Sequence, residues 1–294
     1  MTRLWHAREL STVVILALEI VFFTWYLWPG ADRPHPFFNR SNALLVLKYS
    51  SIYGIAAIGA AIVIISGGID LAPGAIIALT SVVTGWCFVA QGWPLAASVA
   101  SGLLTGVAAG LVSSWLIVRV GLPPFIATLG VMGIARGIAF IVTEARYYDL
   151  SRSIPPGSRV VGVPIDWIAP FVMIGAALVF QTLMKSFQWG RAVFAIGGNE
   201  TAALFTGIAV GPIKTSVYVV AGLLASASGI VLAVAQGQGK ADLATGYELD
   251  IIASAVVGGA SLAGGRGSVV GRTTGPLQGR DVATGRSPSI FVAR

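Results

Sequence analysis

Few residues of this chain could carry out covalent chemistry. The two histidines, His6 and His35, fall in a terminal segment and a proline-rich stretch, with no matching serine or cysteine nucleophile. The one cysteine, Cys87, lies in an apolar segment and excludes an intramolecular disulfide and a cysteine-based zinc site. The stretch "GQGKAD" lacks the earlier glycine and the following Ser or Thr of a phosphate-binding loop. We therefore expect no catalytic residue, no metal site, no cofactor and no ATP hydrolysis by the chain itself.

The polar residues inside apolar stretches are the remaining candidates, and Asp70 in "SGGIDLAPG" (66–74) is the first. No other charged residue occurs between Lys48 and Arg119. A carboxylate at the centre of a bilayer costs about 2.5–3.5 kcal/mol, so Asp70 must be paired, solvated or buried in protein. Gly67 and Gly68 would break the helix before it. Two interpretations stay open: Asp70 caps the next helix at a sharp cytoplasmic turn, or it belongs to a transport path.

Arg136 is the second candidate, because it is the only charge within "IATLGVMGIARGIAFIV". Its side chain could reach the lipid headgroups, or it could pair with Glu248 or Asp250 at the start of "YELDIIASAVVGG". The glycine-rich stretch "GGASLAGGRGS" (258–268) suits close helix contact, a re-entrant turn or a simple loop. We expect Gly67, Gly68, Asp70, Arg136, Glu248 and Asp250 to line a translocation path or to brace its helices.

The composition indicates which surroundings position these residues. Of 294 residues, 55% are hydrophobic and only 11% are charged, against about 25% charged in a typical soluble domain. The mean hydropathy is +0.83, which favours a bilayer as the solvent. The net charge of +7 comes largely from scattered or terminal arginines, so a nucleic-acid-binding surface is not expected. No cleavable signal peptide is evident, and the first apolar stretch is expected to be a retained helix.

The pattern of apolar runs predicts an all-α, polytopic integral membrane protein with about eight transmembrane helices. Two polar loops stand out, over 144–167 and 185–214. In the second loop, Asn199 is placed to cap a short helix outside the membrane, with Glu200 in its first turn. Lys and Arg divide equally between the two sides, so they do not decide the orientation. The expected spans are roughly 11–28, 44–66, 71–91, 94–118, 123–143, 167–184, 213–235 and 250–264.

Four long stretches together resemble the permease subunits of bacterial ABC importers for ribose, galactose, arabinose and xylose. Permeases for branched-chain amino acids and nucleosides share parts of this pattern. The similarity covers nearly all of residues 10–271. The stretches are "GGIDLAPGAIIAL" (67–79), "VGLPPFIATLGVMGIARG" (120–137), "GRAVFAIGGNETAALFTGI" (190–208) and "GYELDIIASAVVGGASLAGGRGSVVG" (246–271).

The resemblance implies a multi-pass subunit of the bacterial inner membrane that imports a monosaccharide. Its implied partners are an ATP-binding subunit, a periplasmic sugar-binding protein and a second permease copy, identical or different. The loop 185–214 would be cytoplasmic and dock on the ATPase, and the outer loops 144–165 and 236–249 would face the binding protein. The implied coupling residues are Gly190, Arg191, Gly197, Asn199, Glu200, Ala202, Ala203, Gly207 and Ile208.

The chain departs from this family at its C-terminal end. The permease domain is expected over 1–270, whereas 271–294 is a polar, arginine-rich tail where the family continues through about two more spans. The abrupt change predicts a frameshifted or truncated end, although a naturally divergent tail stays open. The alternatives to a sugar permease are therefore a branched-chain amino-acid or nucleoside permease, and a truncated remnant that does not transport.

Overall fold

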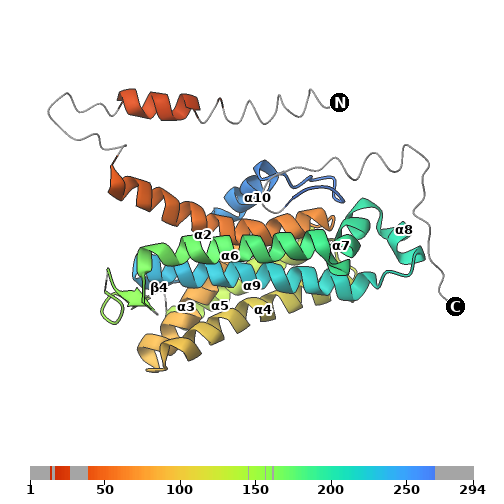
Figure 1. The fold of residues 1–294 in the computed structure, drawn as a ribbon. Coiled ribbons are helices and arrows are strands. Elements are labelled where there is room, and N and C mark those ends of the chain that lie inside the picture. Colours follow the sequence, from red (N-terminus) through yellow and green to blue (C-terminus); the bar gives the residue numbers. More distant parts are fainter. Residues whose placement is uncertain are drawn as a thin grey trace. The chain divides into compact units, whose positions relative to one another are not determined.

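The computed structural model describes residues 14, 17–26, 39–144, 146–155, 157–160 and 162–268. The tail over 271–294 lies outside the described residues. The chain forms two units, residues 1–50 and 51–294, and the second contains every feature analysed below. The elements (Figure 1) are α2 (Arg40–Ile65), α3 (Pro73–Gly85), the π-helical turn η1 (Trp86–Ala90), α4 (Leu95–Val118), α5 (Pro124–Thr143), β1 (Tyr147–Asp149), β2 (Arg159–Val160), β3 (Val163–Pro164), α6 (Ile165–Ser186), α7 (Gln188–Gly198), α8 (Glu200–Phe205), α9 (Val210–Gln236), β4 (Gln238–Lys240) and α10 (Tyr247–Val257).

Six helices of the described part are long and apolar enough to cross a membrane: α2, α3 with η1, α4, α5, α6 and α9. The expected all-α, polytopic membrane fold is confirmed. Only Ala17–Tyr26 is described as helix around the first expected span, apart from residue 14.

The expected last span, 250–264, is not a span. Helix α10 has only 11 residues, which is about 16 Å at 1.5 Å per residue and half of a ~30 Å hydrocarbon core. It ends because Gly259 adopts a left-handed conformation with φ of 109°. The Gly259 N–H then donates to Val256 O and the Ala260 N–H to Ala255 O, both at 3.0 Å. These two bonds satisfy the free carbonyls of the last turn.

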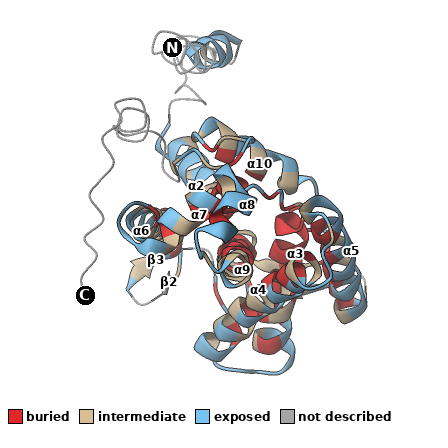
Figure 2. Cartoon of the chain, turned by 90° about the vertical axis from the view of Figure 1, so that its right-hand side faces the viewer, coloured by how far each residue is buried: buried red, intermediate tan, exposed pale blue. Residues whose placement is uncertain are grey.

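Helices α3 and α9 form the centre of the second unit, and Figure 2 shows their buried residues between α4, α5 and α2. Nearly all of α3 is buried, including Ile76 and Ile77. Helix α9 packs on both α3 and α4. Its Ser228 hydroxyl donates to the Ile52 carbonyl of α2 at 2.8 Å, so a polar group in the core has its partner.

The loops predicted to be polar lie at opposite ends of the helices. Strand β1 of the first loop pairs antiparallel with β4, with Tyr147 opposite Lys240 and Asp149 opposite Gln238. The second loop forms α7 and α8, which lie at the other end (Figure 1). This arrangement follows from the alternating direction of consecutive spans.

Small residues set the spacing between α4 and α9. Gly102, Gly106 and Gly110 follow one another at intervals of four residues on the buried face of α4. A Cβ at Gly106 would overlap the Gly222 carbonyl of α9 and lie 2.5 Å from the Ser226 Cβ. Glycine repeats of this kind let two helices approach at backbone distance in a membrane.

The close approach predicts a stability loss when Gly106 is replaced by alanine. The added methyl has no space, so the free energy of unfolding should fall by about 1–3 kcal/mol. Gly130→Ala is the matched control, because Gly130 of α5 is exposed and no atom lies within 4 Å of its Cβ position. Thermal unfolding in detergent, followed by circular dichroism, checks this, and equal melting temperatures for the two variants would contradict it.

Candidate functional site

The turn between α2 and α3 is built by glycines rather than by Asp70. Gly67 has φ of 85°, which favours glycine strongly. The Gly67 N–H donates to Ile64 O and the Gly68 N–H to Val63 O, each at 3.0 Å. This is the Schellman arrangement that closes a helix C-terminus. Gly68 has a second reason to be glycine, because a Cβ there would overlap the buried hydroxyl of Tyr218.

Asp70 stabilises the turn that leads into α3. Its Oδ1 accepts a hydrogen bond from the Ala72 N–H at 2.8 Å, just before α3 begins at Pro73. The N–H of Leu71, between Asp70 and Ala72, donates to the Thr128 hydroxyl of α5 at 3.2 Å. The expectation that Asp70 caps the next helix is therefore wrong in detail, because α3 has Ala72 as its N-cap and no side chain caps its first turn. Asp70 stabilises the turn before α3, and the linker 66–72 is tied to α5 as well.

The Asp70 carboxyl is only 4% exposed, so water cannot stabilise its charge. Burial raises the pKa of this carboxyl from 3.8 to about 6, and the hydrogen bond from Ala72 opposes the shift only in part. The carboxyl lies in the linker outside the helical spans. Close to neutral pH it carries a charge that the fold tolerates at a cost.

The segment between β4 and α10 runs along α3 instead of staying at the outer end. At its beginning, Gly239 packs against Ser81 and Gly85 of α3, and the Lys240 N–H donates to the Ser81 hydroxyl at 3.3 Å. At its end, the Ala244 carbonyl faces Gly74. Gly85 and Gly74 are eleven residues apart, which is about 16 Å along a helix. Only the first part of the expected outer loop 236–249 therefore stays at the outer end.

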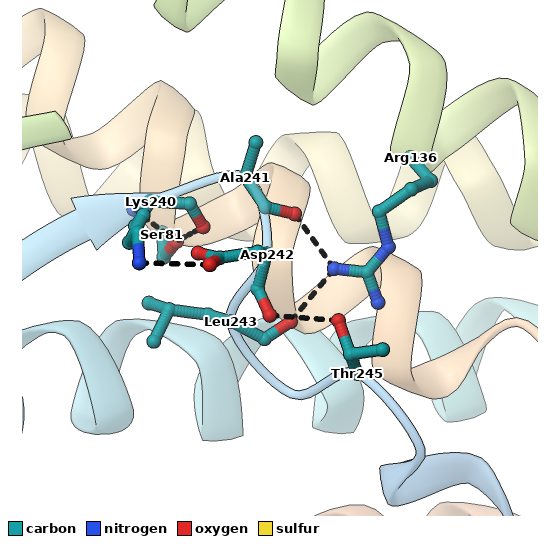
Figure 3. Close-up of polar contacts among 7 residues, drawn as sticks. All are labelled: Ser81, Arg136, Lys240, Ala241, Asp242, Leu243 and Thr245. Atoms are coloured by element: carbon teal, nitrogen blue, oxygen red, sulfur yellow. Dashed lines mark hydrogen bonds and ion pairs between the residues drawn. The ribbon is translucent and has the colours of Figure 1, made fainter. Parts of the chain in front are cut away.

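Arg136 supplies the hydrogen bonds that this irregular backbone needs. Its Nη1 donates to the carbonyls of Ala241 and Leu243, both at 2.7 Å (Figure 3). Backbone that is not helical is tolerated at membrane depth only where protein or water satisfies its polar groups. One guanidinium on α5 thus supports two carbonyls of the segment 241–246.

This arrangement corrects the predicted partners of Arg136. Among the described residues, no ion pair within 4 Å joins Arg136 to Glu248 or Asp250, although the charge of Glu248 is close enough to attract the guanidinium. The Arg136 side chain contacts the backbone of the segment 241–246 instead. Glu248 instead extends towards α3, where its Oε2 would lie 2.6 Å from a Cβ on Gly74. Asp250 is exposed on the first turn of α10. Sequence reasoning missed these partners because backbone carbonyls leave no residue-type signal.

The loop 185–214 contains the predicted cap and a helix outside the spans. The Asn199 side chain accepts a hydrogen bond from the Ala202 N–H at 2.9 Å and so caps α8. Glu200 forms an ion pair of 2.6 Å with Lys214 at the start of α9. The predicted short helix is confirmed, and Lys214, which was not predicted, ties it to the next span.

The end of α8 explains two further predicted residues. Gly207 has φ of 84°, and its N–H donates to Leu204 O at 3.0 Å. The Ile208 N–H donates to the Ala203 carbonyl at 3.1 Å. Leu204 is 60% and Phe205 85% exposed. Sequence reasoning missed these two, although two large apolar residues in a short polar-loop helix were the available signal.

Gly190 and Arg191 lie where α6 turns into α7. A Cβ on Gly190 would overlap the backbone of Met184, so the two helices can turn sharply only at a glycine. Arg191 donates from Nη1 to the Ser186 carbonyl at 3.3 Å, close to the end of α6. Cations near a helix C-terminus are stabilising. Both residues therefore shape the connection that carries α8.

The raised pKa of Asp70 predicts that Asp70→Asn stabilises the protein at high pH. The folded pKa lies above the unfolded one, so this carboxyl lowers the stability as pH rises from about 4 to about 6. Above that window the cost is on the order of 3 kcal/mol, from about 1.4 kcal/mol per pKa unit. The asparagine keeps the Oδ1 acceptor and loses the charge. Thermal unfolding in detergent should show a higher melting temperature for the variant at pH 8 and little difference at pH 3.5.

Asp149→Asn is a control of opposite sign. Asp149 is in an outer strand, and the hydrogen bond from the Ser151 hydroxyl lowers the pKa of its carboxyl. Its stabilising effect is present at high pH and lost in acid, so the asparagine variant should be weaker at pH 8 only. A gain for Asp70→Asn that is the same at both pH values would contradict the role of the charge.

The comparisons with known proteins agree with a transport fold. A family model described as "Branched-chain amino acid transport system / permease component" matches residues 42–277. The ribose import permease RbsC of Escherichia coli K12 is 35% identical over 285 residues, which cover 94% of this chain and 84% of the relative. No solved structure matches the chain.

Two further relatives carry different names. The D-allose transport system permease AlsC of Escherichia coli K12 is 32% identical over 270 residues, covering 91% of this chain and 80% of AlsC. The fructose import permease FrcC of Rhizobium meliloti is 30% identical over 273 residues, covering 90% of this chain and 74% of FrcC. The match over 42–277 and these identities show that the chain belongs to the family of transport-system permease components.

Proposed function

We propose that the chain is the membrane-spanning subunit of an ATP-binding-cassette importer that moves a monosaccharide across the bacterial inner membrane. The observation that carries this proposal is the 30–35% identity to ribose, allose and fructose permeases over at least 90% of the chain. The six apolar helices of the described part support the multi-pass arrangement. The chain supplies the path and a separate partner supplies ATP hydrolysis.

We infer that the path runs beside two irregular segments, the linker that follows span α2 and the segment 241–246. The linker 66–72, with Gly67, Gly68 and Asp70, reaches the core from one end of the unit. The segment 241–246 reaches the core from the other end. Glu248 and Asp250 lie in the first turn of α10, which follows this segment. Backbone that departs from helix at membrane depth characterises substrate sites in other transporter folds. These residues line or brace the path in this proposal.

The ATP-binding subunit docks on α8 in this proposal. The support is the exposure of Leu204 and Phe205 on a capped helix outside the spans. Gly190, Gly197 and Gly207 shape the hairpin that presents this helix. A sugar-binding protein would meet the opposite end, formed by β1 and β4. A second permease copy completes the assembly in this proposal, and nucleic acid has no part in it.

A branched-chain amino acid is the second candidate substrate, favoured only by the description of the matching family. Vesicles that contain the chain, its ATP-binding subunit and its binding protein distinguish the two substrates. We expect ATP-dependent uptake of radiolabelled ribose, allose or fructose and none of leucine. Uptake of leucine without any sugar would reverse the assignment, and uptake of neither would indicate a remnant that does not transport.

The exposed face of α8 predicts that Phe205→Ala weakens docking without unfolding the protein. A buried aromatic anchor at an interface is worth about 2 kcal/mol or more, so the affinity for the ATP-binding subunit should fall by at least about 30-fold. Pull-down titration of the detergent-solubilised subunits measures this. Phe171→Ala, which removes an exposed phenylalanine of span α6, is the control and should keep full affinity. Equal affinities for both variants would remove α8 from the interface.

The two carbonyl bonds predict that Arg136→Met impairs both stability and uptake. Each buried carbonyl left without a donor costs about 1–3 kcal/mol, and the segment 241–246 would lose its position beside α3. Arg119→Met is the control, because Arg119 is exposed at the end of α4. The double charge swap between Arg136 and Asp250 should not rescue uptake. Rescue by that swap would show that Arg136 acts through an ion pair instead.

A further inference from the structure

Three segments that are distant in sequence meet through backbone atoms alone next to α8. They are the end of α7 at Gly197 and Gly198, the end of α2 at Ile65, and the loop after α10 at Gly264 and Gly265. The Gly265 N–H donates to the Ile65 carbonyl at 2.9 Å. A Cβ on Gly197 would overlap that same carbonyl and lie 2.6 Å from the Gly265 nitrogen. We call Gly197, Gly264, Gly265 and the Ile65 carbonyl the glycine junction.

The junction has no room for a side chain on any of its three glycines. A Cβ on Gly264 would lie 2.5 Å from the Gly197 oxygen, and one on Gly265 would lie 2.5 Å from the Gly198 Cα. Gly198, one residue later in α7, differs, because no atom lies within 4 Å of its Cβ position. The contact is therefore confined to one side of α7.

The glycine junction lies close to α8 and to the linker that contains Asp70. Asn199, which caps α8, follows Gly197 by two residues. The linker that contains Asp70 starts directly after Ile65, and a Cβ on Gly67 would lie 3.6 Å from the Gly197 Cα. The loop of Gly264 and Gly265 follows α10, which begins at Tyr247. The end of α7, which precedes α8, thus contacts the start of the linker 66–72 and the loop after α10 at one point.

Contact between backbones transmits displacement differently from contact between side chains. Side chains change rotamer and absorb a shift, whereas close-packed atoms with no free volume pass strain on. A movement of the end of α7 must therefore displace the end of α2 and the loop after α10, or break the bond from Gly265 to Ile65.

We propose that the glycine junction transmits the movement of the docked α7–α8 hairpin to the linker 66–72 and to α10, so that Gly197 and Gly265 position the path for transport. This inference rests on the proposed function. It assigns to Gly197 a role in coupling that is separate from docking, since Gly197 contacts Ile65 and Gly265 whereas the proposed docking residues are Leu204 and Phe205.

Gly197→Ala is the direct test, with Gly198→Ala as its matched control. Both glycines are in α7 and neither has a positive φ, so the two variants gain the same helix propensity and differ only in the contact. In vesicles with the ATP-binding subunit and the binding protein, Gly197→Ala should lower sugar uptake about tenfold or more, the size of a lost coupling free energy. The ATP-binding subunit should stay bound and keep hydrolysing ATP. Gly198→Ala should stay within about twofold of the unchanged protein.

A second experiment tests the proposal on the unchanged complex, without any variant. Hydrogen–deuterium exchange should change in the peptides over 66–72 and 258–267 when ATP binds to the partner subunit, because the Gly265 amide forms the junction bond. Full uptake by a folded Gly197→Ala variant, or no exchange change in those peptides, overturns the proposal. If the unchanged complex takes up no sugar at all, the proposed function fails, while the exchange measurement still decides whether docking moves the junction.

Discussion

Backbone amide and carbonyl groups that leave a helix in apolar surroundings must find their partners inside the protein, and the candidate site depends on how this chain meets that requirement. At the ends of α2, α8 and α10, a left-handed glycine closes the last turn and pairs the free carbonyls. Along α3, the chain forms turns between β4 and α10, and there Arg136 donates to two carbonyls. The polar groups of this irregular backbone therefore have hydrogen-bond partners inside the protein.

Close approach of backbones is the second consequence of so many glycines. Between α4 and α9, Gly106 and Gly222 bring two spans into direct contact, and this contact belongs to the permanent core. At the glycine junction, the same kind of contact joins α7 to the turn after α2 and to the loop after α10. The first contact holds two spans together, whereas the second joins the end of α7 to the end of α2 and to the loop after α10. Both contacts are formed by glycines, so only their positions in the fold indicate that the first packs two spans together and the second transmits movement.

Features that depend on residues close together in the sequence could be predicted. Asn199 before Glu200 predicted the cap of α8, and the glycines before Asp70 predicted the turn in which that carboxylate accepts from the Ala72 N–H. The partners of Arg136 could not be predicted, because these are carbonyls more than 100 residues away that any residue type could provide. The expected span over 250–264 was wrong for a local reason, since hydropathy outweighed the Gly258–Gly259 stop signal. Glycine identity at 197 indicates a close approach, but only the fold shows to which segment.

The depth of the segment 241–246 in the bilayer decides whether this irregular backbone lies beside α3 inside the membrane. Single nitroxide labels can be placed at residues 93, 242 and 245 in a Cys87→Ser background, and their depth in a bilayer measured from collisions with oxygen and a nickel chelate. The label at 93 marks the outer end, because Trp93 lies between η1 and α4. We expect the label at 242 to lie deeper than the one at 93, and the label at 245 deeper still. Labels at 242 and 245 that lie level with 93 would contradict this expectation, because the segment would then be an ordinary outer loop.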